Sequence, residues 1–153
     1  MPHAVSRRRR AALLAGVALG VVLGLSACTG SGVEDDYLAD LTVAGRHATA
    51  VVHDEATTGV FLVPPPADVG AAVAGPDLVM RPASDKAADP LRQLAATGSG
   101  QASDGTQCDI QAYRTAPSRV MAEAWKFSDE DTAAWESGRL TVVQLAVGCP
   151  FAS

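Results

Sequence analysis

Histidine and cysteine are the residue types in this chain with the widest chemical reach, and there are only three of each. His47 and His53 lie six residues apart, which places them about 120° apart on a helix but on the same face of a strand. Asp54 and Glu55 adjoin His53 and would extend such a pair toward a surface metal site. No third ligand is fixed by the spacing, so we expect two solvent-facing histidines beside a turn, with no metal and no cofactor.

Cys28 stands at the end of a segment that is typical of a secretory signal. Arg7–Arg10 supply a basic start, residues 11–25 (AALLAGVALGVVLGL) carry no charge, and two small residues come immediately before the cysteine. An apolar stretch of this length makes about 22 Å of helix, which is short of the roughly 30 Å hydrocarbon core of a bilayer. An uncleaved membrane anchor is the alternative, but the pattern favours a signal peptide over residues 1–27.

The four residues Leu25-Ser26-Ala27-Cys28 resemble the lipobox of bacterial lipoproteins, which is an aliphatic residue, two small residues and a cysteine. The resemblance covers residues 1–28 only. It implies that the Cys28 thiol is acylated, that the bond before Cys28 is cleaved, and that the mature chain is held at the membrane by its acyl chains. Two acyl chains give stable anchoring where one gives only marginal binding. Residues 6–14 (SRRRRAALL) also loosely resemble a twin-arginine signal, so the export route stays open.

The mature chain is expected on the extracytoplasmic face of the cell membrane, because the N-terminal arginines stay cytoplasmic. In an exported protein the two remaining cysteines, Cys108 and Cys149, are expected to form one disulfide. It would close a loop of about 42 residues and contribute about 4 kcal/mol by the chain-entropy argument. The chain has no C-x-x-C pair and no histidine near either cysteine, so redox and zinc chemistry are not favoured.

Charge separates the signal from the rest of the chain. The net charge is −5 overall, but the part after residue 27 has 8 basic and 17 acidic side chains, which makes −9. A surface this acidic repels phosphate backbones, so we expect no nucleic-acid partner. It also stands off from an anionic membrane surface. We expect residues 28–36 to form a lipidated flexible tether and residues 37–153 to form a single domain.

Local patterns predict the elements of the N-terminal half. A continuous helix through 37–53 competes with a shorter helix and a hairpin, because short apolar runs are ambiguous by period. Residues 64–106 look loose, since they hold six prolines and few large apolar side chains. Within them, Asp89 suits the N-cap of a helix and residues 98–105 look flexible. The elements predicted in this half are helices at 37–44 and 89–98 and strands at 47–53, 60–63 and 77–80.

The C-terminal third has the clearest patterns. Ser128 suits an N-cap and Asp131 follows three residues later, as in a capping box, which explains the acidic run 129–131 better than a Ca²⁺ site does. The last apolar run is interrupted only by Thr141 and Gln144, which suits a central strand. The elements predicted here are strands at 108–114, 118–127 and 140–148 and a helix at 128–138. Together they predict an α+β fold, a small antiparallel sheet with helices packed on one face and one disulfide.

Motifs that would identify an enzyme are missing from the sequence. It has no G-x-S-x-G, no H-E-x-x-H and no phosphate-binding loop, so we expect no catalytic residues. Trp125 and Trp135 would suit a sugar-stacking platform, but in a chain with few aromatics we expect core residues. We therefore expect a lipid-anchored binding or interaction module of the cell envelope, whose partner is an envelope protein or a small ligand. The alternative is a small hydrolase-like enzyme of the envelope that depends on His47 or His53.

Overall fold

The computed structural model describes residues 32–84 and 89–150, which form eight strands and four short helices. In chain order they are α1 (Gly32–Asp40), β1 (Thr42–Val43), β2 (Ala50–His53), β3 (Thr57–Val63), α2 (Val69–Ala72), β4 (Val73–Ala74), β5 (Val79–Pro82), β6 (Arg92–Gln101), β7 (Gln107–Thr115), α3 (Arg119–Ala124), α4 (Asp129–Glu136) and β8 (Thr141–Gly148). Six of the strands form an antiparallel sheet in the order β2-β3-β8-β7-β6-β5, and β1 pairs with β4 in a second, two-stranded sheet.

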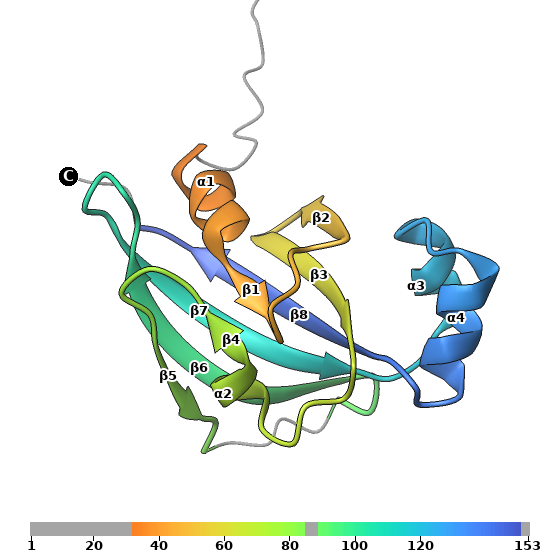
Figure 1. The fold of residues 1–153 in the computed structure, drawn as a ribbon. Coiled ribbons are helices and arrows are strands. Elements are labelled where there is room, and N and C mark those ends of the chain that lie inside the picture. The colour runs from red at the N-terminus through yellow and green to blue at the C-terminus, as the bar shows by residue number, and fades with distance from the viewer. Residues whose placement is uncertain (1–31, 85–88, 151–153) are drawn as a thin grey trace, which may run out of the picture.

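The large sheet makes up the body of the molecule (Figure 1). The predicted α+β class, a small sheet with helices packed on one face, is therefore wrong: the described residues are mostly β, and their longest helix has nine residues. The sheet is larger than predicted because residues 64–106, which look loose in the sequence, supply β5 and the long strand β6. The helices also do not share a face, since α1 and α2 lie on one side of the sheet and α3 and α4 on the other.

Residues 89–98 show strand pairing overriding a local helix signal. Asp89 does act as a cap, but only of a turn, where its carboxylate accepts a hydrogen bond from the backbone N–H of Leu91 at 2.9 Å. From Arg92 onward the chain is β6, which pairs with β7 along nearly its whole length. The predicted helix is wrong because helix propensities differ by less than about 1 kcal/mol per residue, which long-range pairing and burial easily exceed.

The glycines at the end of β6 serve close packing. A Cβ atom at Gly98 would lie 2.6 Å from the backbone oxygen of Val79 in β5, and one at Gly100 would overlap the hydroxyl of Tyr37 in α1. Residues 98–101, predicted as the start of a flexible stretch, are therefore the last part of a strand. These glycines let a neighbouring strand and a helix approach the sheet closely.

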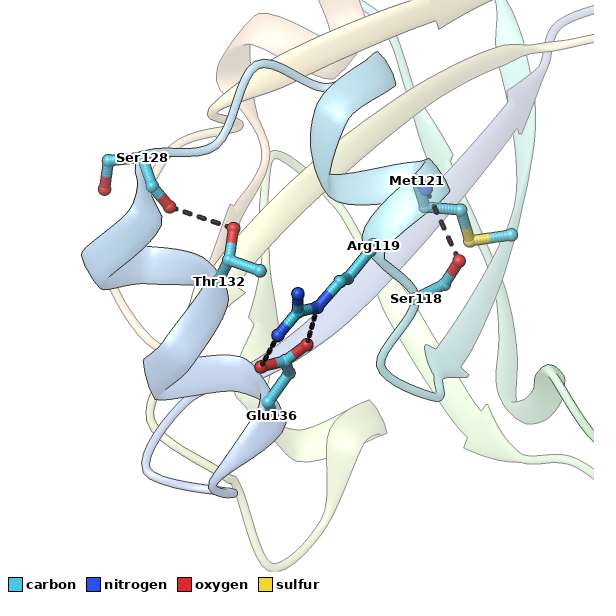
Figure 2. A network of polar contacts seen from close by, with 6 residues as sticks. All are labelled: Ser118, Arg119, Met121, Ser128, Thr132 and Glu136. Atoms are coloured by element: carbon cyan, nitrogen blue, oxygen red, sulfur yellow. Dashed lines mark hydrogen bonds and ion pairs between the residues drawn. The ribbon is translucent and has the colours of Figure 1, made fainter.

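Residues 118–127, predicted as a strand, instead contain α3. The Ser118 side chain accepts a hydrogen bond from the backbone N–H of Met121 and so caps the helix (Figure 2). Met121 and Trp125 are four residues apart, a spacing that suits one helix face as well as one strand face. Glu123, between them in the sequence, is exposed. The strand prediction is wrong because an apolar pair four residues apart fits both periods.

Helix α4 confirms the helix predicted over 128–138. Ser128 is its N-cap and accepts from the backbone N–H of Asp131 at 3.1 Å, and Gly138 ends the helix at a φ of 76°. Figure 2 shows the ion pair that joins the two C-terminal helices, in which the Arg119 guanidinium donates to the Glu136 carboxylate. This exposed contact lowers the pKa of Glu136, but exposed pairs of this kind add little stability.

The N-terminal half agrees with the predictions in part. The hairpin is confirmed as β2 and β3, which excludes the continuous helix through 37–53. The predicted helix at 37–44 exists but lies earlier, because α1 begins at Gly32 and ends at Asp40. Residues 32–36, predicted as part of the flexible tether, are therefore the first half of α1. The strand predicted at 77–80 is confirmed as β5, shifted by two residues.

Two separate cores lie on the two faces of the sheet. The larger one packs α1 and the small sheet against one face through Leu38, Leu41, Phe61 and Leu145. The smaller one packs α3 and α4 against the other face, around Trp135 and Val142. Strand β8 contributes to both because it is central, as predicted, and alternates its side chains between the faces.

Candidate functional site

The predicted disulfide between Cys108 and Cys149 is confirmed. Cys108 lies near the start of β7 and Cys149 directly follows β8, and the two Cα atoms are 4.2 Å apart. The neighbouring residues Asp109 and Gly148 are paired in the antiparallel register, which brings the cysteines together. Both cysteines are buried, so this pair is a structural link. Cys28, the predicted lipidation site, lies outside the described residues.

The two histidines do not form a site. His47 lies exposed in the loop before β2, so the rule that even spacing shares a strand face does not apply to it. His53 ends β2, and its Nε2 atom lies 2.6 Å from a carboxylate oxygen of Asp35 in α1. Within residues 32–84 and 89–150, no group of three histidine, cysteine or acidic side chains is arranged to hold a metal ion.

The two tryptophans take different roles. Trp125, Phe127 and Trp135 form an aromatic cluster with ring centroids 5.7 to 5.9 Å apart. Trp135 is a core residue, as predicted, since it is 2% exposed and its indole N–H donates to the backbone oxygen of Thr115. Trp125 is only half-buried and also lines a hollow on the sheet.

That hollow lies where α3 and α4 leave the sheet face uncovered. It has a volume of about 460 Å³, which falls within the roughly 300–1,000 Å³ of ordinary ligand sites. We call it the polar trough, and its floor consists of Thr58, Gln111, Tyr113, Gln144 and Ala146. Trp125 and Met121 of the α3 segment form one wall, and the β2–β3 turn forms another.

The strand register explains why these side chains meet. Ala146 of β8 pairs with Thr58 of β3 on one side and with Gln111 of β7 on the other. The next row of the same face has Gln144 paired with Tyr113. Because side chains alternate along a strand, all five point away from the main core. The small methyl group of Ala146 between two larger polar side chains leaves the floor hollow.

Two buried polar side chains in the floor are not used by the fold. Gln144 is 6% exposed and Thr58 is 8% exposed, yet the described part of the chain offers no hydrogen bond to the amide of Gln144 or to the hydroxyl of Thr58. Their polar atoms are not sealed from solvent, since the buried side-chain atoms without a partner among the described residues are Arg92 Nε and the Thr115 hydroxyl, so these groups open into the hollow. A sheet interior filled for stability alone would carry apolar side chains here, so these groups point to a ligand.

Arg92 and Tyr113 close the far end of the polar trough. The Arg92 guanidinium lies over the Tyr113 ring, 3.8 Å from its centroid, and the Arg92 Nε atom is buried without a partner among the described residues. The Tyr113 hydroxyl donates to the Oε1 atom of Gln111 at 2.6 Å. That bond orients the Gln111 amide and leaves its NH₂ group as a donor toward the hollow.

A second hollow, of about 330 Å³, lies at the C-terminal end of β7 beside α4. Its walls are mainly apolar, with Leu91, Leu140 and three prolines. Arg114 and Trp135 also line it, but both already donate to backbone oxygens. The buried Thr115 hydroxyl, which has no partner in the described ranges, is its one comparable feature. The second hollow therefore offers fewer free polar groups that could hydrogen-bond to a ligand and orient it than the polar trough does.

The sequence contains the signal for the polar trough only in pieces. The alternation in 108–114 places Gln111 and Tyr113 opposite the buried Ile110, and Gln144 stands out in an apolar strand. What the sequence lacks is the register that sets these strands side by side, and it also misplaces Arg92 on a helix. Sequence reasoning missed the site for that reason.

The described residues contain no helix that is both long and apolar enough to cross a membrane. The chain matches no protein-family model, no curated protein and no solved structure.

Proposed function

We propose that this chain is an extracytoplasmic lipoprotein, anchored through Cys28, whose folded part binds a ligand in the polar trough. The observation that carries the proposal is the Gln144 side chain, which is only 6% exposed, makes no hydrogen bond within the described residues and lines the floor of an open hollow. The lipobox-like residues before Cys28 support the anchoring and the location, since they end an apolar segment preceded by arginines. The role follows as that of a binding module of the cell envelope.

The enzyme alternative finds less support in the geometry. It depends on His47 or His53, and His53 is engaged with Asp35 of α1, on the face opposite the polar trough. His47 is exposed in a loop. A general base must lie within hydrogen-bond reach of a bound substrate, and neither imidazole lines the polar trough.

The anchoring is tested by mass spectrometry of the membrane fraction. We expect the mature protein to begin at Cys28 and to carry acyl chains on that residue. A Cys28→Ala variant is the matched control, and it should lose both the acyl mass and the cleavage before residue 28. An unmodified Met1, or a Cys28 with a free thiol in the wild-type protein, would show that the lipoprotein assignment is wrong.

The binding role is tested by native mass spectrometry of the protein purified from the membranes of its own host. We expect a non-covalent mass on the wild-type protein that the Gln144→Leu variant lacks. Gln107→Leu is the matched control, because Gln107 is exposed at the start of β7 and does not line the polar trough.

The stability of the Gln144→Leu variant separates a binding role from a structural one. Since the Gln144 amide makes no hydrogen bond within the described residues and leucine is apolar and of similar size, the variant should be at least as stable as the wild type. A clear drop in melting temperature would mean that the amide supports the fold. The same ligand mass on both variants would contradict the polar trough as the site.

A further inference from the structure

We infer that the ligand of the polar trough is a neutral saccharide, a step that rests on the proposed binding function. Four properties of the hollow support it: the charge of its lining, the kind of hydrogen-bonding groups in its floor, an aromatic side chain at its wall, and its position in the sheet.

Charge argues against an anionic ligand. Arg92 is the only cation that lines the polar trough, and its guanidinium already lies over the Tyr113 ring. Asp54 and Glu55 stand exposed at the rim, and the chain after residue 27 carries −9. Asp54 and Glu55 line the rim and not the floor, and the floor has no charged side chain, so a ligand seated on the floor meets only uncharged groups. The lining therefore suits an uncharged ligand.

The hydrogen-bonding groups of the floor match hydroxyl-rich molecules. The Gln144 amide offers a donor and an acceptor side by side, Thr58 adds a hydroxyl, and Gln111 adds an NH₂ donor. Each sugar hydroxyl is likewise both a donor and an acceptor, and two neighbouring hydroxyls fit the fork of one amide. A ligand with only acceptors or only donors would leave part of this set unpaired, which is costly once it is buried.

The wall of the polar trough includes an aromatic side chain, Trp125, against which the apolar face of a sugar ring could stack. Trp125 is half-buried, lines the hollow, and makes no hydrogen bond through its indole N–H within the described part of the chain. An aromatic ring with a free polar tip suits a ligand that presents C–H groups on one face and hydroxyls at its edge. Arg92 covers one face of the Tyr113 ring, so Trp125 is the ring that we assign to the sugar.

The position in the sheet disfavours a peptide. Extended peptides are commonly recognised by pairing with the free backbone of an edge strand. The floor of the polar trough is formed by β3, β8 and β7, which are paired on both sides. Two strand spacings make the floor about 10 Å wide, enough for a sugar unit with neighbours along the hollow. A saccharide is recognised by side chains alone, and these are what the floor offers.

Titration of the purified lipoprotein with defined oligosaccharides tests the inference. The probes are neutral cello-, malto- and chito-oligosaccharides, a sulfated glycan, a polyuronate and an extended neutral peptide, followed by tryptophan fluorescence and calorimetry. We expect at least one neutral oligosaccharide to bind the wild-type protein. Gln144→Leu and Ala146→Leu should each weaken that binding at least tenfold, whereas Gln107→Leu should leave it unchanged. Ala146→Leu removes no polar group and only fills the hollow, and thermal melts confirm that each variant is folded.

The outcomes separate this inference from the proposed function. Binding of the peptide or of the charged glycans alone, sensitive to Gln144→Leu, would overturn the inference of a neutral saccharide and leave the binding role in place. Saccharide binding that both trough variants retain would overturn the site. No binding of any probe, together with no co-purifying mass on the wild-type protein, would overturn the inference and the proposed function together.

Discussion

Removing the disulfide is expected to lower the free energy of unfolding by about 4 kcal/mol, measured as denaturant unfolding of a Cys108→Ala/Cys149→Ala double variant. The two residues are 41 positions apart, and the link restricts the unfolded chain far more than the folded one, in which β7 and β8 are already paired. For a chain of this size the melting temperature should fall by roughly 10–20 °C.

Two controls separate the cross-link from the side chains. Reduced wild-type protein should unfold close to the double variant, because both lack the link. The two single-alanine variants should be no more stable than the double variant, since each also lacks the bond. If the double variant came within about 1 kcal/mol of the oxidised wild-type protein, the disulfide would not be a main support of the sheet.

Replacing Trp135 with alanine is expected to cost about 3–5 kcal/mol of unfolding free energy. Its side chain is 2% exposed, packs against Trp125 and Phe127, and joins α4 to the end of β7 through the hydrogen bond to Thr115. Because the smaller core depends on this residue, the helices α3 and α4 should loosen first. Hydrogen exchange of the α4 amides would show the loss of protection directly.

Trp135→Phe is the matched control for this substitution. It keeps an aromatic ring against Trp125 but removes the indole N–H, so the expected cost falls to roughly 1–2 kcal/mol. Unchanged protection of α4 in Trp135→Ala would contradict the role of this side chain as the anchor of the two helices.

Three features of the fold could be read from the sequence because their signals are local. Ser128 and Gly138 mark both ends of α4, the turn after His53 marks the β2–β3 hairpin, and the apolar run before Cys149 marks a central strand. Each signal is complete within a few residues, as caps, turns and unbroken apolar runs are. The cysteine pair could be predicted for another reason, since only two remain once Cys28 is assigned to the signal.

The larger errors came where local chemistry fits two outcomes. Asp89 and Pro90 can begin either a helix or a turn. The following residues form a strand because they pair with β7. Met121 and Trp125 can share one face of a helix or one face of a strand. The segment forms a helix because that helix covers the sheet face around Val142. In both cases contacts with distant residues outweigh a weak local preference.

The sequence by itself determined an acidic chain with a lipobox-like start, a cysteine pair, a capped helix and a central strand that carries one glutamine. The tertiary structure alone decided that this glutamine lies in a hollow beside Thr58, Gln111 and Tyr113. These residues come from three strands spread along the chain, and they meet only because strand register sets which side chains stand next to one another. A shift of one residue would turn each of them to the opposite face, so no local pattern could have revealed the polar trough.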